Sequence, residues 1–226
     1  MSFTLLGLDM SLVNAIDSLD YKKPYPIQQK AIPAILEKND VLGIAKTGSG
    51  KTASYVLPIL QNLQSVVAQK NRKVNALIVV PTRELAVQVE EVFRQFSSHL
   101  PNPVKTMAVY GGVSINPQMK ALYGVNVLIA TPGRLIELLD SKAVHLSSVS
   151  TLVLDEADKM LNLGFKDEMD KIFSLLPSVR QNLLFSATFP REVENIARNY
   201  MTKPVEISSG ARNSGSDNVE NEYYQV

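Results

Sequence analysis

The chain has 226 residues, of which 45% are hydrophobic, and its 23 Lys and Arg against 22 Asp and Glu give a formal net charge of +1. This size and hydrophobic content suit one large domain with a packed core. The balanced charge excludes binding of nucleic acid through overall charge, so that any such contact must come from a local patch. Cysteine is absent, which excludes disulfides and thiolate metal sites. The sequence shows neither a secretory signal pattern nor an apolar run as long as a membrane span, and we expect a cytoplasmic protein without membrane contact.

Two helices are predicted at the beginning of the chain. Apolar residues recur at three- and four-residue intervals from Leu5 to Leu19, which predicts an amphipathic helix. The segment from Asp20 to Tyr25 interrupts this pattern. Pro26 suits the first turn of a second helix, which we expect over Ile27 to Leu36.

A glycine-rich loop between a predicted strand, Val41 to Ile44, and a predicted helix, Ala53 to Leu63, is the most informative stretch. It reads Ala45-Lys46-Thr47-Gly48-Ser49-Gly50-Lys51-Thr52, and it departs from the general phosphate-loop pattern only at its first position, where Ala stands for Gly. A loop of this kind points backbone N–H groups and the positive end of a helix dipole at phosphate oxygens. We expect Lys51 to reach the β and γ phosphates of a nucleotide and the Thr52 hydroxyl to hold Mg²⁺. The alternative is a plain strand–turn–helix with a solvated lysine.

Further strands and helices alternate along the rest of the chain. Strands are predicted at Ala76 to Val80, Thr106 to Val109, Val125 to Ala130, Thr151 to Leu154, Leu183 to Phe185 and Val205 to Ile207. Helices are predicted at Glu84 to Phe96, Pro132 to Leu139, Phe165 to Leu175 and Arg191 to Tyr200. This alternation predicts an α/β fold with a mostly parallel, doubly wound sheet flanked by helices and with ligands at the carboxyl ends of its strands.

A second chemical landmark, Asp155-Glu156-Ala157-Asp158, directly follows the strand Thr151 to Leu154. Clustered carboxylates repel one another unless a cation compensates, so the pattern indicates a metal site. In a phosphate-loop enzyme the Asp at this place holds Mg²⁺ and a neighbouring Glu orients the attacking water. Asp155 and Glu156 fit these roles. The alternative is a solvated acidic turn at the start of a helix.

The stretch from Asp155 to Asp158 resembles the name-giving motif of the DEAD-box RNA helicases. Other stretches resemble the motifs of that family in the expected order: Ala45 to Thr52, Pro81-Thr82-Arg83-Glu84-Leu85-Ala86, Gly111-Gly112, Thr131-Pro132-Gly133-Arg134 and Ser186-Ala187-Thr188. Pro24-Tyr25-Pro26-Ile27-Gln28 resembles the adenine-reading Q motif, placed at about residues 1–29. The resemblance covers about residues 2–207, so residues 1–207 are expected to form the first of the family's two RecA-like domains, a phosphate-loop NTPase fold. The stretch from Gly111 to Met119 further resembles the bacterial RhlE-like branch.

This resemblance implies an adenine site near the beginning of the chain. Gln28 is expected to offer a paired donor and acceptor to the adenine edge, and Phe3 is expected to stack on the ring. Tyr21 and Lys23 are weaker candidates for lining the base. Two residues depart from the family's pattern, since Asp20 replaces the usual Gly and Tyr25 the usual Thr. For Phe3 the alternative is an apolar residue that packs a terminal segment.

On the RNA side, the resemblance implies contacts with the sugar–phosphate backbone of one strand, without sequence readout. The residues expected to make them are Pro81, Thr82, Arg83, Gly111, Gly112, Thr131, Pro132, Gly133 and Arg134. Two predicted helix starts, at Pro81-Thr82 and Thr131-Pro132, also suit anion binding, because helix N-termini favour phosphate. Alternatively the threonines only cap helices and the arginines are surface or ion-paired residues.

Ser186-Ala187-Thr188 is expected to couple nucleotide state to RNA unwinding through hydroxyl hydrogen bonds to the acidic motif, as the resemblance implies, with Asp158, Ser186 and Thr188 as the coupling residues. His99 and His145 are isolated, and we interpret both as structural or surface residues.

The tail, residues 208–226, is predicted to be a linker that leads into the start of a second RecA-like domain. Its composition is rich in Ser, Gly, Asn and Asp, and no His-Arg-x-Gly-Arg-type stretch occurs after Ser208. In the family the second domain supplies an arginine finger to this site. We therefore expect an ATP-dependent RNA helicase, hydrolysing ATP to ADP and phosphate with Mg²⁺, when the second domain is joined in cis. Alone, the fragment is expected to be monomeric, to bind ATP or ADP and to be nearly inactive.

Two other classes of function remain open from the sequence. One is a different phosphate-loop enzyme, such as a kinase or a transporter ATPase, which would leave the Pro-Thr-Arg-Glu-Leu-Ala, Thr-Pro-Gly-Arg and Ser-Ala-Thr stretches unexplained. The other is a non-catalytic clamp for RNA or protein, in which the nucleotide is structural.

Overall fold

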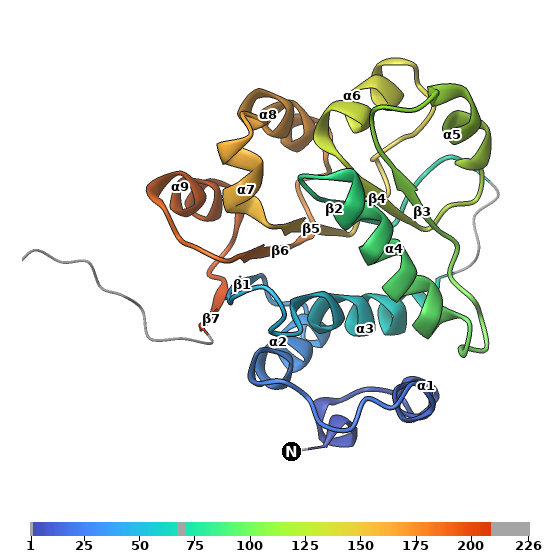
Figure 1. The fold of residues 1–226 in the computed structure, drawn as a ribbon, viewed down its shortest axis with the longest axis vertical. Coiled ribbons are helices and arrows are strands. Elements are labelled where there is room, and N and C mark those ends of the chain that lie inside the picture. Colours follow the sequence, from blue (N-terminus) through green and yellow to red (C-terminus); the bar gives the residue numbers. More distant parts are fainter. Residues whose placement is uncertain (1, 67–70, 209–226) are drawn as a thin grey trace, which may run out of the picture.

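Seven parallel strands form one sheet in the computed structural model, which describes residues 2–66 and 71–208 (Figure 1). The strands are β1 (Val41–Ile44), β2 (Ala76–Val79), β3 (Thr106–Val109), β4 (Val127–Ala130), β5 (Thr151–Asp155), β6 (Gln181–Ser186) and β7 (Val205–Ser208). Their spatial order is β3-β4-β2-β5-β6-β1-β7, and every neighbouring pair runs parallel. The predicted α/β fold with a doubly wound sheet is thereby confirmed.

Helices cover both faces of this sheet, so that the molecule has three layers (Figure 1). On one face lie the 3₁₀ helix η1 (Phe3–Leu6) and the helices α1 (Met10–Ser18), α2 (Pro26–Leu36), α3 (Lys51–Leu63) and α4 (Arg83–Ser97). On the other lie α5 (Ile115–Ala121), α6 (Pro132–Asp140), α7 (Ala157–Asn162), α8 (Lys166–Leu175) and α9 (Arg191–Tyr200).

The strand sequences explain this arrangement, because successive side chains of a strand point to opposite faces. In β2, Ile78 belongs to the hydrophobic cluster under α1 to α4, whereas Leu77 and Val79 belong to the cluster under α6 to α9. All three side chains are fully buried. A strand with apolar side chains on both faces buries them only when helices cover both faces of the sheet, as is usual for parallel sheets.

The predicted helix over Leu5 to Leu19 is wrong as a single element. Gly7 ends η1 in the left-handed region, with φ 83°, and α1 begins only at Met10. Glycine adopts this conformation at little cost, and a sharp turn there lets both short helices bury their apolar faces. The short helices α5 and α7 were not predicted, whereas the other predicted helices and strands are present with ends shifted by a few residues.

The predicted linker at residues 208–226 lies outside the described residues, apart from Ser208 at the end of β7. The boundary of the domain therefore stays a prediction. Within residues 2–66 and 71–208, none of the helices has the length and apolar character needed to cross a membrane.

The strand order sorts the sequence motifs into two neighbouring groups. β1, β5 and β6 lie side by side and lead into the glycine-rich loop, the acidic motif and Ser186. β2, β3 and β4 form the adjacent part of the sheet and lead into the segments that begin at Val80, Tyr110 and Thr131. Because all strands are parallel, both groups lie at the same edge, where α/β proteins bind ligands.

Candidate functional site

The glycine-rich loop connects β1 to α3 and is closed by its own lysine. Gly48 and Gly50 have φ values of 79° and 87°, a region that favours glycine. The buried Lys51 side chain donates from Nζ to the Ala45 carbonyl oxygen at 2.6 Å. Within the described part of the chain, the buried Ser49 hydroxyl has no hydrogen-bond partner. The Ser49 hydroxyl, the Lys51 ammonium group and the N-terminus of α3 are hydrogen-bond donors of the kind that a phosphate group requires.

Gln28 ties the start of α2 to this loop. Its side chain is 1% exposed; Oε1 accepts from the Tyr25 N–H at 2.9 Å, and Nε2 donates to the Gly50 carbonyl at 3.1 Å. A Cβ added at Gly50 would lie 2.5 Å from Nε2 of Gln28, so glycine is needed for this approach. A primary amide has two hydrogens and two lone pairs, and one of each therefore remains for a ligand.

The other three residues expected near adenine lie differently. Phe3 is 4% exposed and packs in the hydrophobic cluster with η1 and α1, as the alternative interpretation holds. The Tyr21 ring packs at 5.3 Å from the ring of Phe96 on α4, and Lys23 is exposed. Because the Phe3 ring offers little open face, stacking on adenine requires this segment to move, and the contacts of all three residues with a base stay predictions.

Asp155 ends β5 and is 2% exposed. Its Oδ2 accepts a hydrogen bond from the Tyr55 hydroxyl at 2.8 Å, and its buried Oδ1 has no partner among the described residues. Burial raises the pKa of Asp155 to about 6, although the hydrogen bond from Tyr55 and the charge of Lys51 lower it. The pKa of the fully buried Tyr55 is raised well above its usual value, first by burial and then by the charge of Asp155.

The three carboxylates of the acidic motif do not converge, which corrects the expectation of one cluster compensated by a cation. Glu156 has φ 56° in the left-handed region and pairs with Lys159 at 3.3 Å, while Asp158 is bound by Thr188. Among residues 2–66 and 71–208, no group of three or more His, Cys, Asp or Glu side chains could hold a metal. A metal would therefore depend on Asp155, the Thr52 hydroxyl and oxygens from a ligand. A left-handed Glu costs about 1 kcal/mol, and such strain is common at functional sites.

Ser186 and Thr188 contact Asp158 as expected. The Thr188 hydroxyl and N–H both donate to Oδ2 of Asp158, at 2.6 Å and 3.0 Å, and the Asp158 N–H donates to the Ser186 hydroxyl at 3.3 Å. Burial alone would raise the pKa of Asp158, but the hydrogen bonds from Thr188 and Ser186 outweigh it and lower the pKa. The end of β6 is thus tied to the start of α7.

On the other half of the sheet edge, both threonines stand at the N-caps of helices. Thr82 caps α4, since its hydroxyl accepts from the Leu85 N–H at 3.2 Å, whereas the Thr131 hydroxyl makes no capping bond at α6. The glycines at positions 111, 112 and 133 have open space where a Cβ would stand. Arg83 at the start of α4 lies over the Tyr110 ring, 4.9 Å from its centroid.

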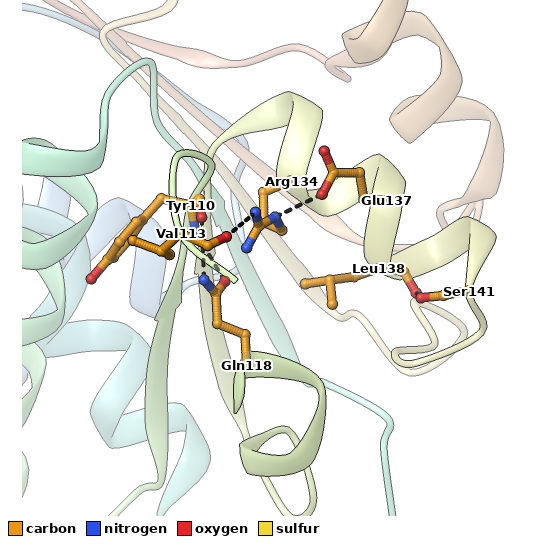
Figure 2. Close-up of polar contacts among 7 residues, drawn as sticks. All are labelled: Tyr110, Val113, Gln118, Arg134, Glu137, Leu138 and Ser141. Carbon is orange, nitrogen blue, oxygen red and sulfur yellow. Dashed lines mark hydrogen bonds and ion pairs between the residues drawn. The ribbon is translucent and has the colours of Figure 1, made fainter. Parts of the chain in front are cut away.

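Arg134 is buried rather than presented to solvent (Figure 2). Its Nη2 donates to the Val113 carbonyl at 2.8 Å, and Nε bonds Glu137 at 2.8 Å. Nη1 is buried and has no partner within the described residues. The arginine is ion-paired, as the alternative interpretation holds, and it also anchors the loop that contains Gly111 and Gly112.

A second anchor of this loop is Gln118 on α5 (Figure 2). Its amide accepts from the Tyr110 N–H and donates to the Tyr110 carbonyl, both at 3.2 Å. These two bonds replace the ladder bonds that a continued strand would have made. Arg83, Gln118 and Arg134 therefore all contact the loop from Tyr110 to Val113, although they come from three separate helices.

Four residues of this site were missed by the sequence analysis: Tyr55, Tyr110, Gln118 and Glu137. Tyr55 could have been found, because it follows Lys51 by four residues, on the same helix face, and a buried tyrosine needs a partner for its hydroxyl. For Gln118 no pattern was available, because the short helix that carries it was not recognised.

Comparisons with known proteins agree with this geometry. The sequence model of the family described as "DEAD/DEAH box helicase" matches residues 25–196. The chain is 41% identical over its full length to "ATP-dependent RNA helicase DeaD" of Escherichia coli strain K12, and covers 35% of that protein. It is 38% identical over its full length to "DEAD-box ATP-dependent RNA helicase RhpA" of Helicobacter pylori strain B128, and covers 44% of it.

A solved structure, that of a DEAD box protein from the hyperthermophile Methanococcus jannaschii, matches with a TM-score of 0.85 and 37% identity. The match covers 93% of the present chain and 56% of that one. The chain spans less than half the length of each of the two bacterial relatives.

Proposed function

Because this chain belongs to the DEAD/DEAH box helicase family, as an N-terminal RecA-like domain, we propose that it is the ATP-binding part of an ATP-dependent RNA helicase. The proposed reaction is hydrolysis of ATP to ADP and phosphate, coupled to local separation of RNA strands when a second RecA-like domain is joined in cis. One observation carries the proposal: β1, β5 and β6 are adjacent parallel strands, and the glycine-rich loop, Asp155 and Ser186 lie at their carboxyl ends.

Four residues of the chain are proposed to have separate roles in binding and hydrolysing the nucleotide phosphates. Lys51 would leave the Ala45 carbonyl and bind the β and γ phosphates, and Glu156 would position the attacking water. Thr52 and Asp155 would hold Mg²⁺, and the orphaned Oδ1 of Asp155 supports this assignment. Bound Mg²⁺ would neutralise the negative charge of the phosphates.

Recognition of the base is proposed to rest on Gln28. Its remaining amide hydrogen and lone pair match the donor and acceptor on the adenine edge, and its bond to Gly50 would place the base next to the phosphate loop. Guanine presents the O6 acceptor where adenine presents the N6 donor, so selectivity for adenine follows.

RNA is proposed to bind along the neighbouring half of the sheet edge, through its backbone. The open space beside Gly111, Gly112 and Gly133 supports close approach of a sugar–phosphate chain. The N-termini of α4 and α6 would face phosphates, with Arg83 nearby. Arg134 would contribute by holding the Val113 carbonyl as well as by any contact of its free Nη1.

Three smaller points belong to the same proposal. A cytoplasmic location is supported by the absence of cysteine, which suits a reducing compartment. A monomeric state is part of the same proposal. Assignment to the RhlE-like branch is proposed from the stretch Gly111 to Met119 alone. The two bacterial relatives, named DeaD and RhpA, do not support it.

Calorimetric titration of Mg²⁺-ADP and Mg²⁺-GDP into the chain and into a Gln28→Ala variant tests the proposal. We expect selective binding of ADP, which weakens by about tenfold or more in the variant because a bound polar group loses its partner. Gln88→Ala, which truncates an exposed glutamine on α4, serves as the matched control and should bind like the parent. Equal binding of both nucleotides, unchanged by Gln28→Ala, would point to a different phosphate-loop enzyme.

A further inference from the structure

Tyr55 reaches the acidic motif from the helix that carries the phosphate-binding lysine. It lies four residues after Lys51 on α3, and its side chain is fully buried. Its hydroxyl donates to Oδ2 of Asp155 at 2.8 Å. This hydrogen bond joins residues a hundred positions apart in the sequence and connects the two predicted landmarks of the nucleotide site.

The position of the Tyr55 ring is fixed by the strands beneath it. It packs against the Phe185 ring, with centroids 5.4 Å apart and an angle of 45° between the planes. Phe185 on β6 is in register with Gly43 on β1 and with Asp155 on β5. A Cβ at Gly43 would lie 2.6 Å from the Phe185 ring, so the glycine leaves the space that this ring fills. The hydroxyl of Tyr55 is therefore held by packing and not only by its hydrogen bond.

The hydrogen bond decides which oxygen of Asp155 remains available. Oδ2 is occupied by Tyr55, whereas Oδ1 is buried and has no partner in the part of the chain that the structure describes. A buried carboxylate oxygen without a partner is costly, unless a ligand satisfies it in the functional state. Without the tyrosine hydroxyl, the carboxylate could rotate and offer either oxygen.

We propose that Tyr55 is a positioning residue of the nucleotide site: its hydroxyl fixes the Asp155 carboxylate so that Oδ1 faces the magnesium ion or its water shell. This inference rests on the proposed function and extends it to a residue outside the recognised motifs. In this role Tyr55 would touch neither nucleotide nor metal and would act through its hydrogen bond to Asp155. A merely structural tyrosine would affect nucleotide binding equally with and without metal, whereas a positioning residue affects the contribution of the metal alone.

The test is the magnesium dependence of ADP affinity in the 226-residue chain, measured by calorimetry in excess Mg²⁺ and in excess EDTA. In Tyr55→Phe, which keeps the ring, we expect the gain in affinity from Mg²⁺ to fall by about tenfold or more, because a hydrogen bond to a charged group is lost. ADP affinity in EDTA should change less than twofold. Tyr200→Phe is the matched control, because it removes a hydroxyl that bonds the exposed Asp170 at 3.3 Å; its metal dependence should equal that of the parent.

A double-mutant cycle with Asp155→Asn shows whether Tyr55 acts through this carboxylate. If it does, adding Tyr55→Phe to Asp155→Asn will not reduce the effect of Mg²⁺ further. An unchanged gain from Mg²⁺ in Tyr55→Phe, an equal loss of affinity with and without metal, or additive effects in the cycle would each overturn the inference while leaving the proposed function intact. If the parent chain bound no ADP in Mg²⁺, the proposed function would fail, and this inference with it.

Discussion

Asp158 shows how one side chain can connect two strand ends. The residue starts the helix after β5, yet its carboxylate accepts two hydrogen bonds from Thr188, beyond the end of β6. Any shift of β6 relative to β5 must break these bonds or carry the acidic motif along. A coupling between nucleotide state and the rest of the protein requires such a linked movement of β5 and β6. The link consists of two groups, the hydroxyl and the N–H of Thr188.

Removal of the Thr188 hydroxyl should lower the stability of the folded chain. In Thr188→Val we expect the free energy of unfolding at pH 7 to fall by about 1 kcal/mol, because one hydrogen bond to a partly buried carboxylate is lost. Urea denaturation followed by circular dichroism gives this value. Thr188→Ser keeps the hydroxyl and is the matched control, expected to lose less than half as much. Equal losses in both variants would mean that the methyl group, not the hydrogen bond, matters.

The hydrogen bonds from Thr188 to Asp158 should also make the free energy of unfolding depend on pH. The pKa of Asp158 is lowered in the folded chain, below the value of about 3.9 in an unfolded chain. The associated stability is therefore fully present above about pH 5 and is lost as the pH falls through the folded-state pKa. The difference in the free energy of unfolding between the parent and Thr188→Val should stay constant from about pH 7 to pH 5 and become smaller below about pH 4. A difference that widened towards acid would contradict the hydrogen bond as its source.

At the scale of single residues, the sequence predicted what local pattern determines. The glycine-rich loop after β1 and the acidic motif at the end of β5 were placed correctly, because ligand-binding residues of a parallel sheet follow the carboxyl ends of its strands. The partners that orient them could not be predicted in the same way. Tyr55 meets Asp155 only because Phe185 and Gly43 shape the space between three strands, a long-range packing relation.

Short elements determine the shape of the presumed RNA side. Among residues 2–66 and 71–208, no strand pairs with the loop from Tyr110 to Val113. The loop is held by α5 through Gln118 and by α6 through Arg134 (Figure 2). The glycines at its tip are thereby fixed in an exposed position without any packing of their own. A loop organised in this way can offer its backbone to a ligand at little further entropic cost.

Gln118→Leu should release this loop. The variant leaves the Tyr110 N–H and carbonyl without partners, so we expect a loss of about 1–3 kcal/mol in the free energy of unfolding. Amide hydrogen exchange at Tyr110 should also become faster, by tenfold or more for each roughly 1.4 kcal/mol lost locally. Gln95→Leu, at an exposed glutamine of α4, is the control that should change neither quantity. Unaltered exchange at Tyr110 in Gln118→Leu would show that the loop is held by other contacts.

The elements that the sequence failed to predict are the short ones. The helices α5 and α7 have seven and six residues, too few for a hydrophobic period to stand out. The long prediction from Leu5 to Leu19 failed for the opposite reason. Its apolar spacing continues across Gly7, although the backbone turns there into the left-handed region. In all three places the tertiary contacts, and not the local pattern, determine where a helix begins or ends.

On the scale of the whole molecule, the strand order places the two proposed binding surfaces side by side at one edge of the sheet. The nucleotide motifs follow β1, β5 and β6, and the segments expected to grip RNA follow β2, β3 and β4, with β2 and β5 adjacent (Figure 1). Sequence analysis predicted the sheet and its edge, because alternation of strands and helices suffices for that. The strand order, and with it this division of the edge, depends on packing between distant segments and could not be derived from the pattern.

The proposed function requires this edge to bind ATP, yet none of the residues proposed to contact the phosphates or the metal, Lys51, Thr52, Asp155 and Glu156, is an arginine. We therefore expect the 226-residue chain to bind ATP and hydrolyse it negligibly, with or without RNA. An arginine finger contributes about 10³- to 10⁵-fold in rate, or about 4–7 kcal/mol of barrier, and none of the proposed site residues supplies one. Release of phosphate from ATP, with and without single-stranded RNA, measures this directly, and Lys51→Ala gives the background. Turnover that rises clearly above that background when RNA is added would show that the chain needs no second domain for catalysis.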